Sequence, residues 1–322
     1  MLKPTISKDN INISLSFIIP AYNVEKYITE TLNSIADQST LPDEIIIIND
    51  GSTDDTSNKI KDHPLSNLIK LIETENRGQG YARNIGIDEA TCDYIYFFDS
   101  DDLLTENFVK NIKKIAIDSE LPDLILFSGK SFKDENFSNS GFFPNYIRPF
   151  EGVYKNQYSF FKALIGAPEL SCSPCLYISK RSIWSNNNLR FNPFFHEDEE
   201  IFYPLIFSSL SYAIFKDIFF LRRIRPNSTM TQSKSRKHEL GQKAILKSLL
   251  NLLNENEKDN LKAKLIRRRL GIFCLSYFST SQKVSNKLNY KLLLSSIIQS
   301  RNIKTPLKII KQTVKLYAQQ TQ

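Results

Sequence analysis

Long apolar runs, signal-peptide features and cysteines are all scarce in this sequence. The nearest approach to a membrane span, residues 202–215, contains Pro204 and three serines, and it is shorter than the roughly 20 apolar residues that cross a bilayer. Residues 1–14 lack the basic start, apolar centre and small-residue cleavage site of a signal peptide. Only 4 cysteines occur in 322 residues, which excludes a disulfide-stapled miniprotein and fits a reducing compartment. The sequence therefore predicts a cytoplasmic protein.

The composition is that of a globular chain with an uneven charge distribution. Hydrophobic residues make up 41% of it and charged residues 24%, which suits a packed core and excludes a disordered chain. The formal net charge is +7, but residues 231–322 contain 19 Lys/Arg and 4 Asp/Glu, against 23 and 31 in residues 1–230. The basic segment indicates either a negatively charged partner, nucleic acid or an anionic membrane, or a solvated helical face.

Buried strands alternate with helices along the first 130 residues. Continuous apolar, β-branched runs are typical of strands buried on both faces, and they occur at 15–20, 44–50, 68–73, 94–99 and 124–129. The intervening segments predict helices at 24–38, 53–62, 78–90 and 105–117. This alternation predicts an α/β fold with helices on both faces of an open sheet. Residues 130–160 are expected to cross the surface, 172–230 to mix strands and helices, and 238–322 to be mainly helical.

Polar side chains follow three of the predicted strands, where each strand ends. They lie in residues 20–23, 49–52 and 99–102. Any one of these segments is equally well explained as a helix cap or turn. Because ligands of open α/β sheets bind outside the carboxyl ends of the strands, the three together favour a binding edge.

The segment Asp99-Ser100-Asp101-Asp102 is the sharpest of these signals. Three carboxylates within four residues repel one another, and burying part of that charge requires a cation. Ligands that are all oxygen favour Mg²⁺ or Mn²⁺ over zinc, and such ions commonly bridge protein carboxylates to a diphosphate. The alternative is an acidic turn before a helix whose dipole favours negative charge.

Four blocks of sequence, residues 16–28, 45–56, 76–102 and 196–202, resemble the signatures of glycosyltransferase family 2, of the bacterial surface-polysaccharide type. The resemblance covers about residues 15–230 and implies a GT-A fold, a Rossmann-like open mixed sheet with helices on both faces. It also implies a nucleotide-sugar donor and an inverting mechanism. It divides the chain into a catalytic domain, 1–230, and a basic helical region, 231–322. The donor half of the catalytic domain is then about 15–130 and the acceptor half about 131–230.

The resemblance also implies roles for individual residues. Asp101, with Asp99, would bind the metal ion, and Asp198 would be the catalytic base, with Glu197 and Glu199 as the next candidates. The remaining donor-site residues by this resemblance are Pro20, Ala21, Tyr22, Glu25, Asp50, Arg83, Asp99 and Ser100. On the residues alone, the acidic stretch around Asp198 is also typical of an exposed helix start.

Several other features receive a structural interpretation. Cys172 and Cys175 have C-x-x-C spacing but lack a second ligand pair, so buried structural thiols are expected. Trp184 fits stacking on an acceptor sugar and core packing equally well. His63 and His238 are expected in solvent. The basic loop 222–230 is expected to close over a diphosphate.

The sequence thus predicts a metal-dependent, inverting transferase with Mn²⁺ or Mg²⁺ as cofactor. It would move one sugar from a nucleoside-diphosphate sugar, UDP favoured, to a glycan or lipid-linked glycan in capsule or lipopolysaccharide synthesis. A sugar-nucleotidyltransferase would need a glycine-rich loop after the first strand, which residues 20–27 lack. A non-catalytic sugar- or nucleic-acid-binding protein is the other alternative, and no nucleic-acid partner is expected. Whether 231–322 contacts the inner face of an anionic membrane or only packs on the catalytic domain stays open.

Overall fold

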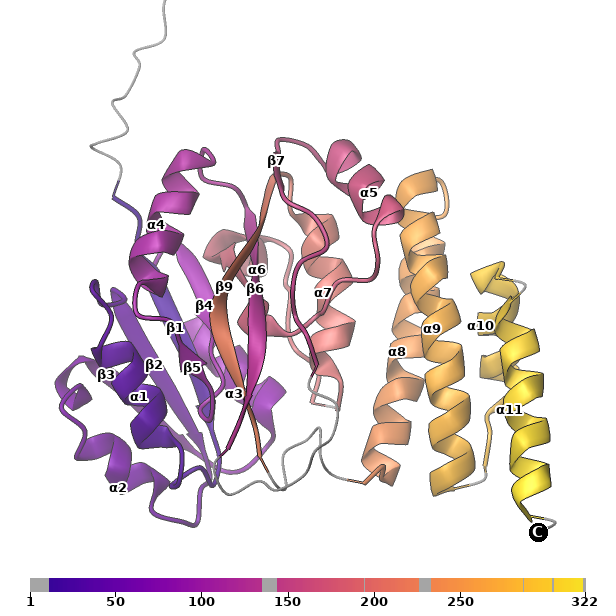
Figure 1. The fold of residues 1–322 in the computed structure, drawn as a ribbon, viewed down its shortest axis with the longest axis horizontal. Helices are drawn as coiled ribbons and strands as arrows, with labels where there is room; N and C mark the ends of the chain where they lie inside the picture. The colour runs from indigo at the N-terminus through magenta and orange to yellow at the C-terminus, as the bar shows by residue number, and fades with distance from the viewer. Residues whose placement is uncertain are drawn as a thin grey trace, which may run out of the picture.

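A curved sheet lies at the centre of the N-terminal part of the protein (Figure 1). The structure is a computed structural model, and it describes residues 12–134, 144–193, 195–225, 233–285, 287–302 and 304–320. Within these residues the sheet has nine strands in the order β3-β2-β1-β4-β8-β6-β9-β5, with β7 beside β9. The strands are β1 (Leu15–Ala21), β2 (Glu44–Asp50), β3 (Ile69–Thr74), β4 (Tyr94–Phe97), β5 (Leu103–Leu104), β6 (Leu124–Lys133), β7 (Gly152–Tyr154), β8 (Tyr177–Lys180) and β9 (Tyr212–Ile224).

Strands β3, β2, β1 and β4 run parallel, and β8 is antiparallel to both β4 and β6. Alternate residues of β1 enter different cores: Phe17 and Ile19 point to one face of the sheet and Ile18 to the other. Both faces are therefore buried, which explains the continuous apolar runs of these strands. The sheet is therefore mixed, as the resemblance to the GT-A fold implies.

Helices cover both faces of the sheet. On the first face lie α1 (Ile28–Ala36), α2 (Thr56–Lys61) and α4 (Phe108–Asp118), which contribute to one core. The second face is covered by α3 (Gln79–Glu89), α5 (Gln157–Gly166), α6 (Arg181–Asn186) and α7 (Glu197–Ser208). A Cβ on Gly86 would lie 2.2 Å from Ile18 Cγ2. This glycine therefore allows α3 to pack directly against β1, and the same helix carries Arg83 towards the carboxyl edge of the sheet.

The described residues of the C-terminal region form four helices, at the right of Figure 1: α8 (Arg236–Glu255), α9 (Asn260–Val284), α10 (Tyr290–Ser300) and α11 (Lys304–Gln320). Leu246, Leu249 and Leu270 belong to a core of this region, whereas Leu265 of α9 joins the core under the sheet. The apolar stripes of α8 and α9 are thus used in packing, as one of the two sequence interpretations expects. Within the part of the chain that the structure describes, none of the helices combines the length and apolar character of a bilayer span.

Candidate active site

A cavity of about 510 Å³ lies at the carboxyl edge of the parallel strands. Residues that follow β1, β2 and β4 line it, so the three polar strand ends come together as the sequence predicts. The start of α3, the start of α7 and the end of β9 complete the wall. Its predicted site residues are Pro20, Ala21, Tyr22, Asp50, Asp99, Ser100 and Asp101, and its other polar members include Glu197, Arg222, Arg223 and Arg225.

The loops after β1 and β2 are tied to each other at one end of the cavity. Asn23 adopts a left-handed conformation with φ 49°, its N–H donates to Ser52 Oγ at 3.0 Å, and its side-chain oxygen accepts from Thr53 N–H at 2.8 Å. Tyr22 is left 49% exposed, so its ring is available for stacking. Glu25 lies outside the cavity lining, where its carboxylate accepts a hydrogen bond from Asp55 N–H at 3.0 Å.

Asp50 is buried where β2 ends, and it organises the turn before α3. Its two carboxylate oxygens accept hydrogen bonds from Arg77 N–H at 2.9 Å and Gly78 N–H at 2.8 Å. Gly78 has φ 94°, a conformation that disfavours other residues. Asp50 therefore sets the shape of this wall and also faces the cavity.

The buried Arg83 joins the two acidic segments of the site. Its guanidinium donates to Asp99 Oδ1 at 2.9 Å and to Glu197 Oε1 at 2.7 Å. Burial alone would lower the pKa of Arg83, but Asp99 and Glu197 outweigh that effect and raise it. Burial raises the pKa of Glu197 to about 7, although Arg83 opposes the rise. Arg83 therefore fixes the loop after β4 relative to the start of α7.

The loop after β4 concentrates carboxylates that the protein only partly compensates. Asp102 is buried, accepts a hydrogen bond from Arg223 N–H at 2.7 Å, and has a pKa raised well above its usual value by burial and by Asp101 and Asp99. Asp101 Oδ2 accepts from Arg225 Nε at 2.5 Å. Ligand atoms of Asp99, Asp102 and Cys175 lie within 4.8 Å of one another. Because carboxyl oxygens are the ligands that hard cations prefer, the aspartates fit Mg²⁺ or Mn²⁺, with the Cys175 thiol a poor ligand for either.

Arginines at the end of β9 face the acidic loop across the cavity. Arg223 donates to the Asp101 carbonyl at 2.8 Å and to Glu30 at 2.6 Å, and the Arg222 guanidinium donates to the Tyr146 hydroxyl at 2.5 Å. They add positive charge beside a cavity that would otherwise repel an anion. Of the predicted closing loop 222–230, residues 226–230 lie outside the described residues.

Asp198 lies in the first turn of α7, next to Glu197. His196 precedes the helix in a left-handed conformation with φ 71°. Asp198 is half-buried, and its Oδ1 accepts a hydrogen bond from Glu199 N–H at 2.9 Å. Burial raises the pKa of Asp198, against the opposing influence of Arg83 and His196. A carboxylate with a raised pKa is a better proton acceptor near neutral pH than an ordinary aspartate.

The structure decides the remaining sequence interpretations. Cys172 and Cys175 are buried with free thiols, as expected. Trp184 belongs to the core, where its ring stacks on Phe191 at 5.3 Å, so the acceptor-stacking alternative is excluded. The prediction of solvated histidines is wrong, because His63 and His238 are 5% and 3% exposed.

The mixed sheet, the acidic loop after β4 and the cavity at the carboxyl edge define a glycosyltransferase domain with the GT-A fold. Residues 16–167 match the Glycosyl transferase family 2 profile, and this part of the chain belongs to that family. Both the predicted family and the predicted fold are therefore confirmed.

Curated relatives carry corresponding names. The chain is 32% identical over 164 residues to glycosyltransferase GlyA of Streptococcus pneumoniae, covering 50% of this chain and 23% of that protein. It is 32% identical over 134 residues to the poly(ribitol-phosphate) beta-N-acetylglucosaminyltransferase TarS of Staphylococcus aureus, covering 40% of this chain and 23% of that protein. For the putative glycosyltransferase EpsH of Bacillus subtilis the identity is 35% over 114 residues, covering 35% of this chain and 33% of that protein. The chain thus spans a third or less of the length of these relatives.

Solved structures extend the likeness to the C-terminal helices. The structure of Staphylococcus aureus TarS 1-349 in complex with UDP-GlcNAc covers 94% of this chain and 92% of its own, with 20% identity and a TM-score of 0.65. The corresponding complex with UDP gives a TM-score of 0.64 at the same identity and coverage. Because residues 231–322 make up more than a quarter of the chain, this common fold includes part of the region that carries no sequence signature.

Proposed function

We propose that the protein is an inverting, metal-dependent glycosyltransferase. It moves one sugar from a nucleoside-diphosphate sugar, UDP favoured, to a hydroxyl of a glycan or lipid-linked glycan in the synthesis of a bacterial surface polysaccharide. The observation that carries this proposal is that the acidic loop after β4 and the start of α7 line one cavity, with Arg83 bonded to Asp99 and Glu197. The complexes of TarS with UDP and UDP-GlcNAc support the choice of donor.

Different residues of the site would bind the donor, hold the metal ion and accept the proton. Tyr22 and Asp50 would contact the nucleoside, and Asp99 and Asp101 would hold the metal ion. That ion supplies positive charge to the diphosphate. The arginines at the end of β9 add charge that favours UDP as leaving group. Asp198 would take the proton of the acceptor hydroxyl as the new bond to the anomeric carbon forms.

The other functions are less well supported. The last residues of β1 and those directly after it in the cavity wall, 20–24, contain no glycine, so the phosphate-binding loop of a nucleotidyltransferase has no counterpart there. Intact Asp101 and Asp198 argue against a non-catalytic binding protein. Two of the basic residues of the C-terminal region, Arg268 and Arg269, pair with Glu169 inside the protein, which weakens the case for nucleic-acid binding.

Titration calorimetry with UDP, GDP, CDP and dTDP tests the donor assignment. With Mn²⁺ present, UDP is expected to bind more tightly than the other three nucleotides, and removal of the ion with EDTA is expected to weaken the binding. Equal affinities for all four nucleotides would contradict the assignment to UDP. Unchanged UDP affinity in EDTA would contradict metal dependence.

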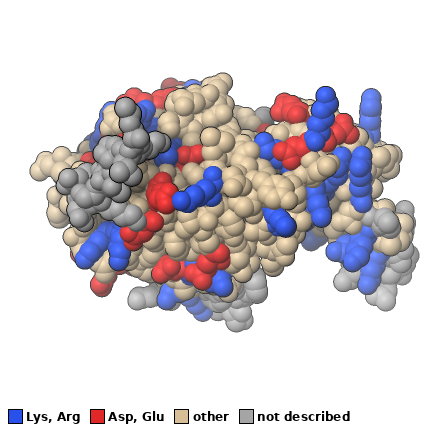
Figure 2. Space-filling view, turned by 90° about the horizontal axis from the view of Figure 1, so that it is seen from above, with Lys and Arg blue, Asp and Glu red and all other residues tan. Residues whose placement is uncertain are grey.

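A peripheral membrane contact through α10 and α11 forms part of the same proposal. Tyr290, Leu294 and Ile298 lie four residues apart on α10 and are 67%, 57% and 71% exposed, and on α11 Leu307 and Ile310 are 62% and 59% exposed. Exposed basic residues flank them: Lys291, Arg301, Lys304, Lys308 and Lys311. Lys and Arg side chains project from this end of the molecule in Figure 2. An anionic leaflet would attract such residues by about 1 kcal/mol each, near a lipid-linked acceptor.

Liposome flotation of the full-length protein tests this contact. The protein is expected to float with anionic vesicles at low salt and to be released as salt screens the charges. Replacement of Lys304, Lys308 and Lys311 by Gln should abolish flotation. The matched control replaces three exposed lysines of the N-terminal part, Lys26, Lys110 and Lys114, and should float normally. Equal flotation of the two triple variants, or no preference for anionic over neutral vesicles, would refute the contact.

A further inference from the structure

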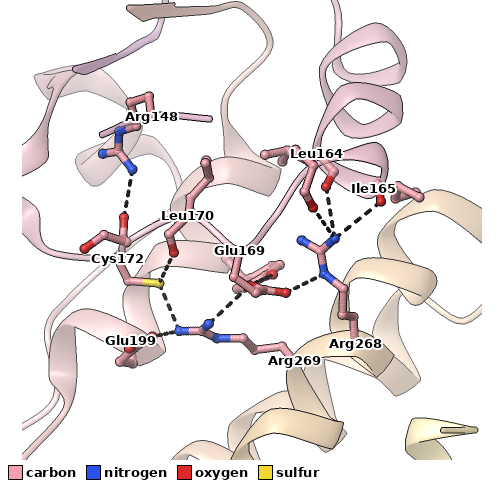
Figure 3. Close-up of polar contacts among 12 residues, drawn as sticks. Arg148, Leu164, Ile165, Glu169, Leu170, Cys172, Glu199, Arg268 and Arg269 are labelled. Atoms are coloured by element: carbon pink, nitrogen blue, oxygen red, sulfur yellow. Dashed lines mark hydrogen bonds and ion pairs between the residues drawn. The ribbon is translucent and has the colours of Figure 1, made fainter. Parts of the chain in front are cut away.

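The arginines of α9 contact the catalytic domain (Figure 3). Residues 267–269 are part of the basic segment for which the sequence left membrane contact open, and the structure directs two of them inward instead. Arg268 donates to the carbonyls of Leu164 at 3.1 Å and Ala167 at 3.0 Å, at the end of α5, and also pairs with Glu169. It therefore satisfies carbonyl groups that the end of a helix leaves without partners, and it anchors α9 to α5.

Arg269 connects α9 to α7. Its guanidinium is buried, pairs with Glu169 at 3.2 Å and with Glu199, and lies 3.1 Å from the Cys172 sulfur. Figure 3 shows the guanidinium between the two carboxylates. Removing one member of such a buried group leaves the others uncompensated, so the arrangement fixes the Glu199 side chain strongly.

Glu199 in turn holds the proposed base. Its backbone N–H donates to Asp198 Oδ1 at 2.9 Å. The position of the Asp198 carboxylate therefore depends on the backbone at Glu199, whose side chain is fixed from α9. Arg269 itself is not among the described residues that line the cavity.

Helix α8 contacts the residues that directly precede α7. A Cβ on Gly241 would lie 2.1 Å from the Phe195 carbonyl oxygen, so only glycine allows this approach. The His238 ring packs against Phe195 with centroids 4.8 Å apart. The residue before the helix, His196, is thus confined by α8, while Glu199 is confined by α9.

We propose that α8 and α9 set the position of the catalytic base, and that Arg269 is a positioning residue that acts through Glu199. The proposal rests on the function proposed above, in which Asp198 is the base. It gives the C-terminal helices a part in catalysis that is separate from any membrane contact. A misplacement of about 1 Å at a reacting group can cost about 100-fold in rate, so loss of this contact should lower kcat much more than donor affinity.

The test compares Arg269→Gln and Glu199→Gln with the matched control Arg268→Gln, which breaks a neighbouring anchor of α9 but does not touch α7. Donor hydrolysis or transfer is followed with whichever of UDP-glucose, UDP-galactose and their N-acetyl derivatives the wild type uses fastest. Both test variants should lose about 10- to 100-fold in kcat, with KM and calorimetric UDP affinity within about twofold of the wild-type values. Arg268→Gln should lose thermal stability but keep kcat within about twofold.

The double variant Arg269→Gln/Glu199→Gln keeps the proposal testable if Arg269→Gln folds poorly, because it removes both charges of the pair. Its kcat is expected to equal that of Glu199→Gln, since the two residues act through one contact. Normal kcat in Glu199→Gln and in the double variant would overturn the proposal, as would equal losses in Arg268→Gln. A wild-type protein that turns over none of the donors would instead refute the proposed function itself.

Discussion

Replacement of Asp198 by Asn is expected to lower turnover by about 10²- to 10⁴-fold, the usual contribution of a general base. Asn has the same shape and still accepts a hydrogen bond from Glu199 N–H, but it cannot accept a proton at neutral pH. UDP affinity should remain nearly unchanged, because a general base acts on the acceptor hydroxyl and not on the nucleotide. Initial rates of donor turnover, together with calorimetric UDP binding, measure both effects.

The pH dependence provides a second signature of the base. Burial raises the pKa of Asp198 above its ordinary value of 3.8, so the base is ionised only above this raised pKa. The kcat of the wild type should therefore fall, as the pH decreases, at a higher pH than an ordinary aspartate would give. The Asp198→Asn variant should not show this fall in kcat.

Glu197→Gln is the informative comparison for Asp198→Asn. Glu197 accepts hydrogen bonds from Arg83 and Gln79, so its replacement should disturb the Arg83 ion pairs and the donor site together. A near-normal turnover rate in Asp198→Asn would contradict the assignment and transfer the role to Glu197 or Glu199.

Replacement of Asp101 by Ala is expected to remove a ligand of the metal ion that would supply positive charge to the diphosphate. Donor binding should weaken, and turnover should fall by about 10²- to 10³-fold, the cost of losing one charge-stabilising group. Folding should persist, because the Asp101 side chain lies at the cavity wall and not in the core. Mn²⁺-dependent UDP affinity, measured by calorimetry, reports the effect directly.

Asp102→Asn is the control for the Asp101 variant. Asp102 is buried and accepts Arg223 N–H, a bond that an Asn side chain can also accept. If Asp101 is a direct ligand, Asp102→Asn should retain most of the Mn²⁺ dependence. Unchanged Mn²⁺-dependent UDP affinity in Asp101→Ala, with loss in Asp102→Asn, would place the ion between Asp99 and Asp102 instead.

The parallel strands of the sheet were predictable because the sequence pattern that indicates each strand lies within the strand itself. A strand buried on both faces is continuously apolar, as residues 15–20 and 44–50 are, and the polar residues after it follow directly in the chain. The short strands β5 and β7 contain two and three residues, too few to show a period. The predicted helix at 24–38 begins only at Ile28, after a turn that directs Tyr22 and Asn23 to the cavity.

Contacts between distant segments were the part of the site that the sequence did not reveal. Arg83 and Glu197 are 114 residues apart, and nothing in either segment identifies the other as its partner. The same holds for Arg269, whose neighbours in the chain resemble a solvated basic run. His238 has polar neighbours in the sequence but packs on Phe195. In each case a buried charge or ring is explained only by a partner on another element.

Turnover of a panel of nucleoside-diphosphate sugars by the wild-type protein tests the central claim most directly. Nucleotide release and the configuration of the liberated or transferred sugar are followed by NMR, with Mn²⁺ and with EDTA. We predict release of UDP from at least one UDP-sugar, dependent on the metal ion, with the anomeric configuration of the first-formed product inverted. Release from none of the donors, or a product that retains the donor's configuration, would contradict the account.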